Sequence, residues 1–384
     1  MKIAYCIDTI TTLGGIERVT IAKANALADV ENNIVFLVVT SNHGIPVLPV
    51  NPKIKIIDLK INYFEDFGKS LFQTYWMLYQ KRKEHKKKLT QFINRNQLDI
   101  LISTYNSEKH FIKSLPISHH CAIIRELHFC SHYRFFKAKT PLQKLLAKIS
   151  HLYDFQWKMK KIDQTVLLTN EDKELYWREH NKVSVIPNPV ISQSPYPPST
   201  TKEKRVIAAG RLVFQKNFSS LIRAWKQVAE IHPDWILEIY GEGGLKIELE
   251  SLITELDLKK NVFLKGKTTD IFRAMSNSSI YVLSSIYEGL PLVILEAMSC
   301  GLPVISYACP CGPKDIITDG KNGFLVNVND EITLANKINL FIENEELRKQ
   351  MSDAAKIKAK QYNIENITSK WMNLFRTLQM KKNK

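Results

Sequence analysis

The amino-acid sequence predicts an α/β protein made of two doubly wound domains, each built on a parallel sheet. Short runs rich in β-branched residues alternate with longer amphipathic segments across residues 1–190. A stretch rich in proline, serine and threonine follows at 191–202, and the alternation then begins again. The length of 384 residues also fits two domains of ordinary size.

In the first half, short apolar runs bounded by turn residues are expected to form buried strands. These runs are residues 3–8, 33–39, 54–59, 98–103, 121–126, 164–169 and 183–187. The segments between them are expected to be helical at 15–28, 67–96, 107–115, 141–161 and 170–179.

The second half repeats this pattern after the proline-rich stretch. Strands are expected at 205–210, 235–241, 261–266, 279–284, 303–307 and 323–326. Helices are expected at 217–231, 244–257, 269–276, 291–300, 313–318, 330–343, 345–361 and 364–378. Ligands of open α/β sheets bind at the carboxyl ends of the strands, so the loops that follow the strands are the candidate site.

Composition narrows the class of protein. The chain is 45% hydrophobic and 24% charged, as is usual for a soluble globular protein. No apolar run approaches the roughly 20 residues that span a bilayer, and Asp8 interrupts an N-terminal run too short for a signal peptide. A cytoplasmic location is therefore expected.

The formal net charge of +16 is densest in the run Lys81–Lys88. A basic surface attracts nucleic acid, anionic lipid or an anionic substrate, although such a run is also typical of a solvated helix face. No RNA-binding motif with interleaved aromatic residues and no zinc module accompanies the charge, which argues against nucleic acid.

Two loops that follow predicted strands could hold an anion. Gly14 and Gly15 open the first helix, where glycine lets the backbone approach a ligand and the helix N-terminus favours negative charge. The loop 210–217 carries Arg211 and Lys216, which suit a diphosphate. Taken alone, the first loop could be an ordinary turn, and the two cations could be solvated.

The most informative segment is YEGLPLVILEAMSCGLPV, residues 287–304, because Glu296 lies within a helix that is otherwise apolar. A buried carboxylate needs a partner. The turn at Gly289 and Leu290 leads into a helix whose first free amides, at Leu292 and Val293, would attract an anion. Glu288 stands outside this helix and Glu296 about two turns inside it. A nucleoside-diphosphate sugar has this layout, with one sugar for each carboxylate.

With these residues the sequence resembles glycosyltransferase family 4, the retaining enzymes of GT-B fold. The most specific element is the E-x7-E pattern from Glu288 to Glu296. The loops at 14–15 and 210–217 and the segments VIPNPV (185–190) and CGPKDIITDGKNGFLV (311–326) match in the expected order.

The resemblance implies two Rossmann-like domains that face a cleft. Residues 1–190 would form the N-terminal acceptor-binding domain and 191–202 the linker. Residues 203–362 would form the C-terminal nucleotide-sugar domain. The C-terminal helix, 363–384, would pack back on the first domain.

The resemblance also implies roles for individual residues. Glu288 would bind the transferred sugar and Glu296 the ribose. Arg211 and Lys216 would stabilise the departing diphosphate, and a histidine, either His128 or its rival His132, would lie near the transferred sugar. The remaining donor contacts implied are Gly14, Gly15, Gly266, Lys267, Thr268, Gly289, Leu290, Leu292 and Val293.

The implied reaction moves a hexose from a UDP- or GDP-linked donor to a saccharide or lipid-linked saccharide in bacterial capsule, O-antigen or exopolysaccharide synthesis. Neither a metal nor another cofactor is expected. Lys81–Lys88 could dock the enzyme peripherally on the inner face of the plasma membrane. The alternatives are a sugar-nucleotide epimerase, a phosphorylase-like enzyme, an inactive sugar-nucleotide-binding protein and, more distantly, a nucleic-acid-binding protein.

Overall fold

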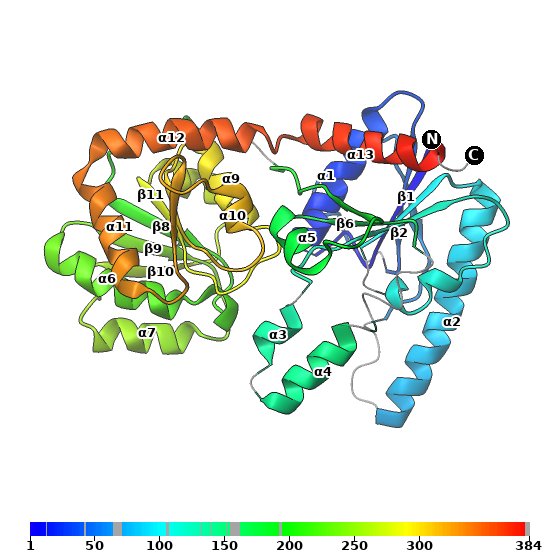
Figure 1. The fold of residues 1–384 in the computed structure, drawn as a ribbon, viewed down its shortest axis with the longest axis horizontal. Coiled ribbons are helices and arrows are strands. Elements are labelled where there is room, and N and C mark those ends of the chain that lie inside the picture. The colour runs from blue at the N-terminus through cyan, green and yellow to red at the C-terminus, as the bar shows by residue number, and fades with distance from the viewer. Residues whose placement is uncertain are drawn as a thin grey trace. The chain divides into compact units, whose positions relative to one another are not determined.

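The structure is a computed structural model that describes residues 1–384 except 13, 42–43, 64–70, 105–106, 132, 139, 152, 154–161, 192–193 and 381–384. The chain forms two units of similar size (Figure 1). The first unit comprises residues 1–168, 176–191 and 364–384, and the second comprises 169–175 and 192–363. Among the described residues, every helix is too short or too polar to cross a bilayer.

The first unit is built on a seven-stranded parallel sheet with the order β3-β2-β1-β4-β5-β6-β7. Successive side chains of a strand point to opposite faces, so both faces of this sheet bury an apolar core. Ile3 and Tyr5 belong to one core, and Ala4 and Cys6 belong to the other. The strands are β1 Lys2–Ile7, β2 Ile34–Val39, β3 Lys55–Asp58, β4 Ile100–Ser103, β5 Ala122–Glu126, β6 Gln164–Leu167 and β7 Val183–Val185.

Helices α1 Gly15–Asp29 and α13 Ile364–Met380 contribute to the core on one face of this sheet, and α2 Leu71–Asn96 contributes to the core on the other. The unit also contains α3 Tyr133–Lys137 and α4 Pro141–His151, which pack on each other. The C-terminal helix α13 packs beside α1, and Trp371 meets Tyr5 of β1 edge to face at 6.4 Å between ring centroids. The return of the C-terminal helix to the first unit, expected from the sequence, is thereby confirmed.

The second unit holds a six-stranded parallel sheet with the order β10-β9-β8-β11-β12-β13. This is the Rossmann order 3-2-1-4-5-6, in which the direction of winding reverses between the first and fourth strands. The reversal lies here between β8 and β11. The strands are β8 Arg205–Ala209, β9 Ile236–Tyr240, β10 Val262–Gly266, β11 Ile280–Leu283, β12 Val304–Tyr307 and β13 Gly323–Val326.

The helices of the second unit mostly match those expected from the sequence. They are α6 Phe218–Ile231, α7 Lys246–Glu255, α8 Ile271–Ser276, α9 Leu292–Ser299, α10 Pro313–Ile316, α11 Glu331–Glu343 and α12 Glu345–Lys360, with α5 Asn170–Tyr176 at the boundary between the units. The two parallel Rossmann-like sheets confirm the predicted fold class.

One predicted helix is wrong. Residues 107–115 form two short 3₁₀ turns, Glu108–His110 and Ile112–Ser114, instead of a continuous helix. The side chain of Glu108 is 1% exposed and accepts a hydrogen bond from Ser103 Oγ at 3.0 Å. This buried contact ties the turn to the carboxyl end of β4, and local polar bonds of this kind compete with regular helix formation.

Candidate active site

Two loops of the second unit meet where its sheet reverses direction. The loop 210–217 leaves β8, and the segment 284–288 leaves β11. Ile286 N donates to Gln215 O at 2.9 Å, and Gln215 Nε2 donates to Tyr287 O at 2.9 Å. Ser284 Oγ also donates to Lys216 O at 2.8 Å. These bonds fix the backbone of both loops at the position where doubly wound sheets bind ligands.

Lys216 and Glu288 form an ion pair at this junction. Lys216 Nζ lies 2.6 Å from Glu288 Oε1, and the two side chains are 16% and 9% exposed. Glu288 is also held through its backbone, because its N–H donates to Pro310 O at 3.2 Å. The structure therefore joins two residues for which the sequence analysis expected different donor groups. Each one positions the charge of the other.

Glu296 lies in α9, the short helix that follows. It is 7% exposed, between the fully buried Leu295 and Ala297. Pro291 is the N-cap residue of this helix, and Ile294 N donates to the carbonyl oxygen of Pro291 at 2.9 Å. The helix therefore begins at Leu292, one residue after the start expected from the sequence. Leu292 and Val293 still occupy the first turn, where the backbone N–H groups have no partner within the helix.

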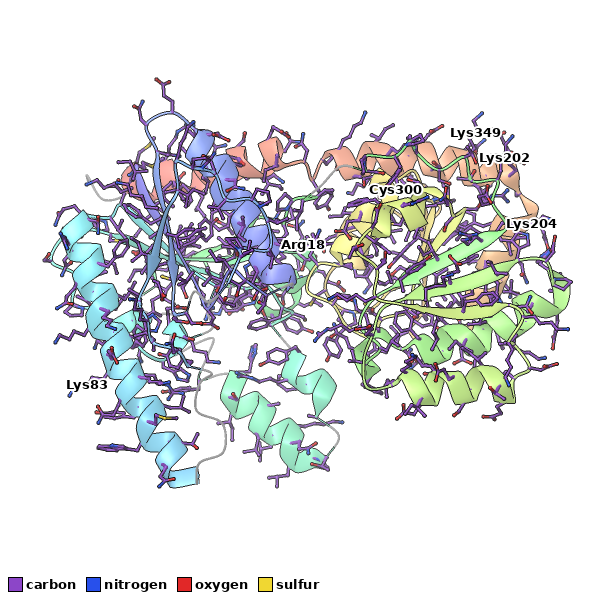
Figure 2. The ribbon with its side chains drawn as sticks, turned by 180° about the vertical axis from the view of Figure 1, so that it is seen from behind. Arg18, Lys83, Lys202, Lys204, Cys300 and Lys349 are labelled. Atoms are coloured by element: carbon purple, nitrogen blue, oxygen red, sulfur yellow. The ribbon has the colours of Figure 1, made fainter. Side chains whose placement is uncertain are left out.

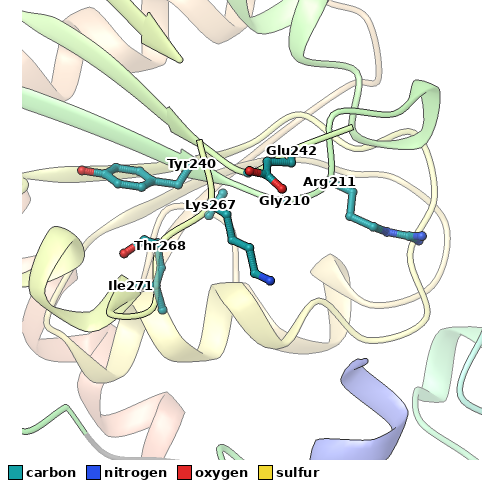
Figure 3. Close-up of a pocket in the computed structure, with 9 residues that line it drawn as sticks. Gly210, Arg211, Tyr240, Glu242, Lys267, Thr268 and Ile271 are labelled. Carbon is teal, nitrogen blue, oxygen red and sulfur yellow. The ribbon is translucent and has the colours of Figure 1, made fainter. Parts of the chain in front are cut away.

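A cavity of about 410 Å³ opens beside the first of these loops (Figure 3). Arg211, Lys267 and Thr268 all line this one hollow. The Arg211 side chain extends away from Thr268 and Ile271, so its guanidinium group lies at the end of the hollow opposite to these two residues (Figure 3). The lining residues are Ala209, Gly210, Arg211, Tyr240, Gly241, Glu242, Lys267, Thr268 and Ile271.

Tyr240, Glu242 and Ile271 line the cavity but were not among the predicted site residues. Tyr240 and Glu242 flank Gly241 at the end of β9, the strand next to β8. Because parallel strands end at one edge, the rule that placed the other loops in the site applies to this loop too. Burial and the nearby Glu238 carboxylate raise the pKa of Tyr240 to about 12, so its hydroxyl stays protonated.

Close backbone contact explains the glycine at 241. Its φ of +144° is unfavourable for other residues, and a Cβ there would lie 1.9 Å from Gly210 O. Gly210 N donates to Tyr240 O, and Leu212 N donates to Glu242 O, at 2.9 and 2.8 Å. The loops after β8 and β9 therefore form one packed wall.

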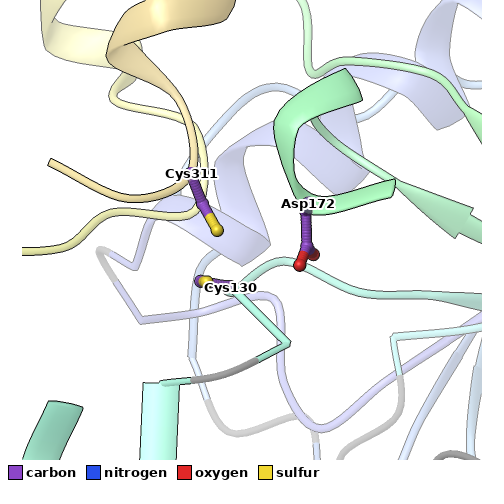
Figure 4. Close-up of side chains that lie close together, drawn as sticks. All are labelled: Cys130, Asp172 and Cys311. Carbon is purple, nitrogen blue, oxygen red and sulfur yellow. The ribbon is translucent and has the colours of Figure 1, made fainter. Parts of the chain in front are cut away.

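The segment 311–326, singled out in the sequence, is anchored by α5. The Asp315 carboxylate accepts hydrogen bonds from Asn170 N at 2.6 Å and Glu171 N at 3.1 Å, which caps the helix from a distant part of the chain. The Glu171 carboxylate accepts in return from Cys311 N and Lys314 Nζ, both at 2.9 Å. Figure 4 shows Cys311 on this loop and Asp172 on α5.

The first unit contains a buried polar cluster around His128, which directly follows β5. The Glu126 carboxylate, fully buried at the end of that strand, forms an ion pair with Lys23 of α1, which is 1% exposed. His128 Nε2 lies 3.6 Å from Glu126 Oε1, and its side chain is 3% exposed. Asn188 completes the cluster, with Nδ2 3.5 Å from His128 Nδ1 and Oδ1 3.3 Å from Lys23 Nζ.

Charge balance in this cluster depends on Lys23. Burial by itself would raise the pKa of Glu126, but Lys23 and then His128 outweigh it and lower that pKa to about 2. The carboxylate is thus ionised at any physiological pH, and one of its oxygens, Oε2, has no hydrogen-bond partner among the residues that the structure describes. Neither Lys23 nor Glu126 was a predicted site residue, although Asn188 belongs to the segment 185–190 that the sequence analysis had noted.

A second buried cluster lies at the carboxyl ends of β1 and β4. Tyr63 OH lies 3.1 Å from His85 Nδ1, and His85 Nε2 lies 3.9 Å from Glu108 Oε1. Burial lowers the pKa of His85 to about 4, and burial followed by the nearby Asp8 charge raises the pKa of Glu108 to about 7. The basic run Lys81–Lys88 is therefore not a uniformly solvated face, because His85 at its centre is buried.

The remaining predicted residues divide between the units. Gly14 is the N-cap residue of α1, and Gly15 is its exposed first residue, both in the first unit. In the second unit, which holds the cavity and the ion pair, Gly266 is the last residue of β10, and Gly289 and Leu290 lie between β11 and α9. His132 lies outside the described residues. That the two groups of residues share one site stays a prediction.

Solved structures identify the class of protein to which this arrangement of two parallel Rossmann-like units belongs. TarM of S. aureus, solved with UDP, α-GlcNAc-glycerol and fondaparinux, matches with a TM-score of 0.74 over 97% of this chain and 99% of its own, at 18% identity. HepE of Anabaena, solved with UDP, matches with a TM-score of 0.73 over 98% of this chain and 100% of its own, also at 18% identity. The fold is that of the GT-B glycosyltransferases.

Sequence comparison carries the assignment further. Residues 193–358 match the family described as Glycosyl transferases group 1. An uncharacterized glycosyltransferase of Haemophilus influenzae is 32% identical over 97% of this chain and 99% of its own length. The amylovoran biosynthesis glycosyltransferase AmsD of Erwinia amylovora is 27% identical over 97% and 99%. The chain belongs to the group 1 glycosyl transferases and is a glycosyltransferase.

Proposed function

We propose that this glycosyltransferase moves a hexose, with retention of configuration, from a UDP- or GDP-linked donor to a saccharide or lipid-linked saccharide acceptor. The observation that carries the proposal is the Lys216–Glu288 ion pair at the reversal of the second sheet, followed at once by α9 with Glu296. A cation, free helix amides and two carboxylates in this order suit a diphosphate with a sugar on either side.

In this proposal Lys216, Arg211 and the amides of Leu292 and Val293 stabilise the negative charge that develops on the departing nucleoside diphosphate. Fixed cations and amides aimed at a leaving group are usually the largest single contribution to catalysis. Because they neutralise the diphosphate, the mechanism we propose uses no metal. Glu288, positioned by Lys216, accepts hydrogen bonds from the transferred sugar.

The cavity between β8, β9 and α8 would receive the nucleoside. Glu296 would accept hydrogen bonds from the ribose hydroxyls. The base would lie near Gly266, Lys267 and Thr268, of which the last two line the cavity. Solved relatives of the same fold were crystallised with UDP, which favours a uridine-linked donor among the candidates.

His128 would lie near the transferred sugar, with Glu126 as a positioning residue. The acidic partner 3.6 Å from Nε2 holds the imidazole beside the end of β5. Lys23 keeps Glu126 ionised, so α1 contributes to the orientation of His128 through the carboxylate.

The acceptor is proposed from full-length relatives. One, of Campylobacter jejuni, is 26% identical over 97% of this chain and 98% of its own length, and its name describes an N-acetylgalactosaminyltransferase that acts on an undecaprenol-linked saccharide. AmsD is named for the biosynthesis of amylovoran. We infer a role for this enzyme in bacterial surface-polysaccharide assembly, at the cytoplasmic face of the membrane.

The test is a panel of UDP- and GDP-sugars screened for binding and for slow hydrolysis. Glu296→Ala is expected to weaken donor binding, and Glu288→Gln is expected to lower turnover more than binding. Glu250→Gln is a matched control, because this exposed glutamate of α7 pairs only with the exposed Lys246 among described residues. Wild-type turnover in Glu288→Gln would remove that residue from the mechanism.

The same panel separates transfer from the alternatives. Conversion of one nucleotide sugar into its epimer in the absence of an acceptor would identify an epimerase. Release of a sugar phosphate in the presence of inorganic phosphate would identify a phosphorylase-like enzyme. Either result would contradict the proposal.

A further inference from the structure

Helix α4 of the first unit presents an apolar stripe away from the protein. Leu142, Leu145, Leu146 and Ile149 follow the spacing of one helix face and are between 54% and 66% exposed. The helix packs inward through a different face, at Ala147, which is 7% exposed. Four large side chains are thus left in water on a helix about 16 Å long, which is unusual for a soluble surface.

The N-terminal part of α2 presents exposed aromatic rings on the same side of the first unit. Tyr75, Trp76 and Tyr79 are 70%, 57% and 52% exposed, and the rings of Trp76 and Tyr79 stack at 5.8 Å. Figures 1 and 2 view the molecule from opposite sides, and in both α4 and this end of α2 project from the lower edge of the unit. Tryptophan and tyrosine are the residues enriched where lipid headgroups meet the apolar chains.

Positive charge accompanies both elements. Helix α4 contains Lys144 and Lys148 and no acidic residue. On α2, Lys83 and Lys87 are exposed, and Lys83 points away from the helix (Figure 2). A surface that combines leucines, interfacial aromatic rings and lysines complements an anionic bilayer in both polarity and charge.

The structure also shows why Lys81–Lys88 alone does not form this surface. Lys81 Nζ donates to Asn62 O, and Lys88 Nζ donates to Leu59 O, so both ends of the run bind the protein's own loops. His85 at the centre is buried. The candidate membrane surface is therefore formed by the N-terminal end of α2 together with α4, and not by the run Lys81–Lys88 that charge density suggested.

We propose that the apolar stripe of α4 and the aromatic cluster Tyr75, Trp76 and Tyr79 of α2 insert into the headgroup region of an anionic bilayer. The lysines of α4 then contact the lipid phosphates. The inference rests on the proposed function only in that a lipid-linked acceptor would be met at such a surface. A protein partner is less suited, because protein interfaces are depleted in lysine, whereas the polar face of this helix carries two lysines.

The proposal is tested by flotation of the full chain with vesicles of phosphatidylethanolamine and phosphatidylglycerol, compared with vesicles of phosphatidylcholine. The wild-type protein is expected to float with the anionic vesicles. The double variant Leu145→Gln, Leu146→Gln, which leaves the charge unchanged, is expected to lose at least tenfold in affinity. The double variant Lys144→Gln, Lys148→Gln is expected to lose about fivefold for each lysine.

The matched control is Ile247→Gln with Ile332→Gln. These residues of α7 and α11 are 74% and 65% exposed, and the control is expected to float like the wild type. Trp76→Gln is expected to weaken binding by less than the leucine pair. Unchanged thermal unfolding verifies that each variant is folded.

Three results would overturn the proposal. The first is that the wild type does not float with the anionic vesicles. The second is that the leucine variant floats as well as the wild type, because binding would then depend on charge alone. Self-association that the leucine variant abolishes in sedimentation, without any vesicle binding, would identify a second copy as the occupant. Hydrolysis of the donor requires no vesicle. If the wild type hydrolysed no nucleotide sugar, that result would contradict the proposed function but not the proposed membrane contact.

Discussion

Replacing Lys23 by methionine should destabilise the first unit strongly. The substitution keeps the length of the side chain but leaves the carboxylate of Glu126, which is fully buried, without its cation. The pKa of Glu126 is about 2 in the folded protein against an ordinary 4.5. At about 1.4 kcal/mol per pH unit, this net shift, in which the partners outweigh burial, corresponds to about 3 kcal/mol of stability at neutral pH. Loss of one partner from a buried ion pair costs about 3–5 kcal/mol, in agreement.

The assay is urea unfolding at pH 7, followed by tryptophan fluorescence, because Trp371 lies 5.5 Å from Lys23 Nζ. Adding Glu126→Leu to Lys23→Met is expected to recover most of the loss, because apolar groups of similar volume often replace a buried ion pair at little cost. The reasoning is refuted if Lys23→Met unfolds like the wild type, or if the double variant is no more stable than the single one.

The pH dependence of stability provides an independent check on the same pair. A carboxyl group whose pKa is lowered by folding contributes stability above its unfolded pKa and loses it as pH falls toward the folded value. The contribution of Glu126 should therefore disappear between about pH 4.5 and pH 2. The double variant, which lacks the carboxylate, should show a shallower loss of stability over this range.

Three further predictions concern other parts of the molecule. Lys216→Ala should lower turnover by about 10²–10³-fold, because it removes a cation from the leaving group and leaves Glu288 unpaired; Lys246→Ala is the control, and near-normal turnover would refute the role. Gly241→Ala should destabilise the second unit and reduce donor binding, because the new methyl group would meet Gly210 O; thermal unfolding with and without UDP measures both effects. Glu108→Gln should gain stability relative to the wild type as pH rises from about 4.5 to 7, because a carboxyl group whose pKa is raised to about 7 loses its contribution over that range; equal pH profiles in urea would contradict this prediction.

Much of the candidate site was predictable because it follows a rule of topology. Once strands were predicted at 205–210 and 279–284, Arg211, Lys216 and Glu288 had to lie at the same edge of a parallel sheet. Tyr240 and Glu242 lie at the same edge but were not predicted as site residues, because the glycine-rich run 241–244 fits an ordinary turn as well as a ligand-binding loop.

The clusters of the first unit could not be predicted in the same way. Lys23 and Glu126 are 103 positions apart, and neither sits in a distinctive motif. In the sequence, Lys23 reads as one charged position of an amphipathic helix. Its burial is decided by α13, whose Trp371 ring packs 5.5 Å from the ammonium group, and by the end of β5.

By itself, the sequence determined the two Rossmann-like halves and the positions of the loops of the candidate site, because hydrophobic periodicity and strand ends are local properties. The return of the C-terminal helix was implied by the family resemblance. Only the tertiary structure decided which charges pair and which apolar residues stay outside. Lys216 holds Glu288, Lys23 holds Glu126, His85 turns inward from a basic run, and the leucines of α4 turn outward. Pairing and exposure depend on neighbours distant in the chain, which no spacing within a single segment records.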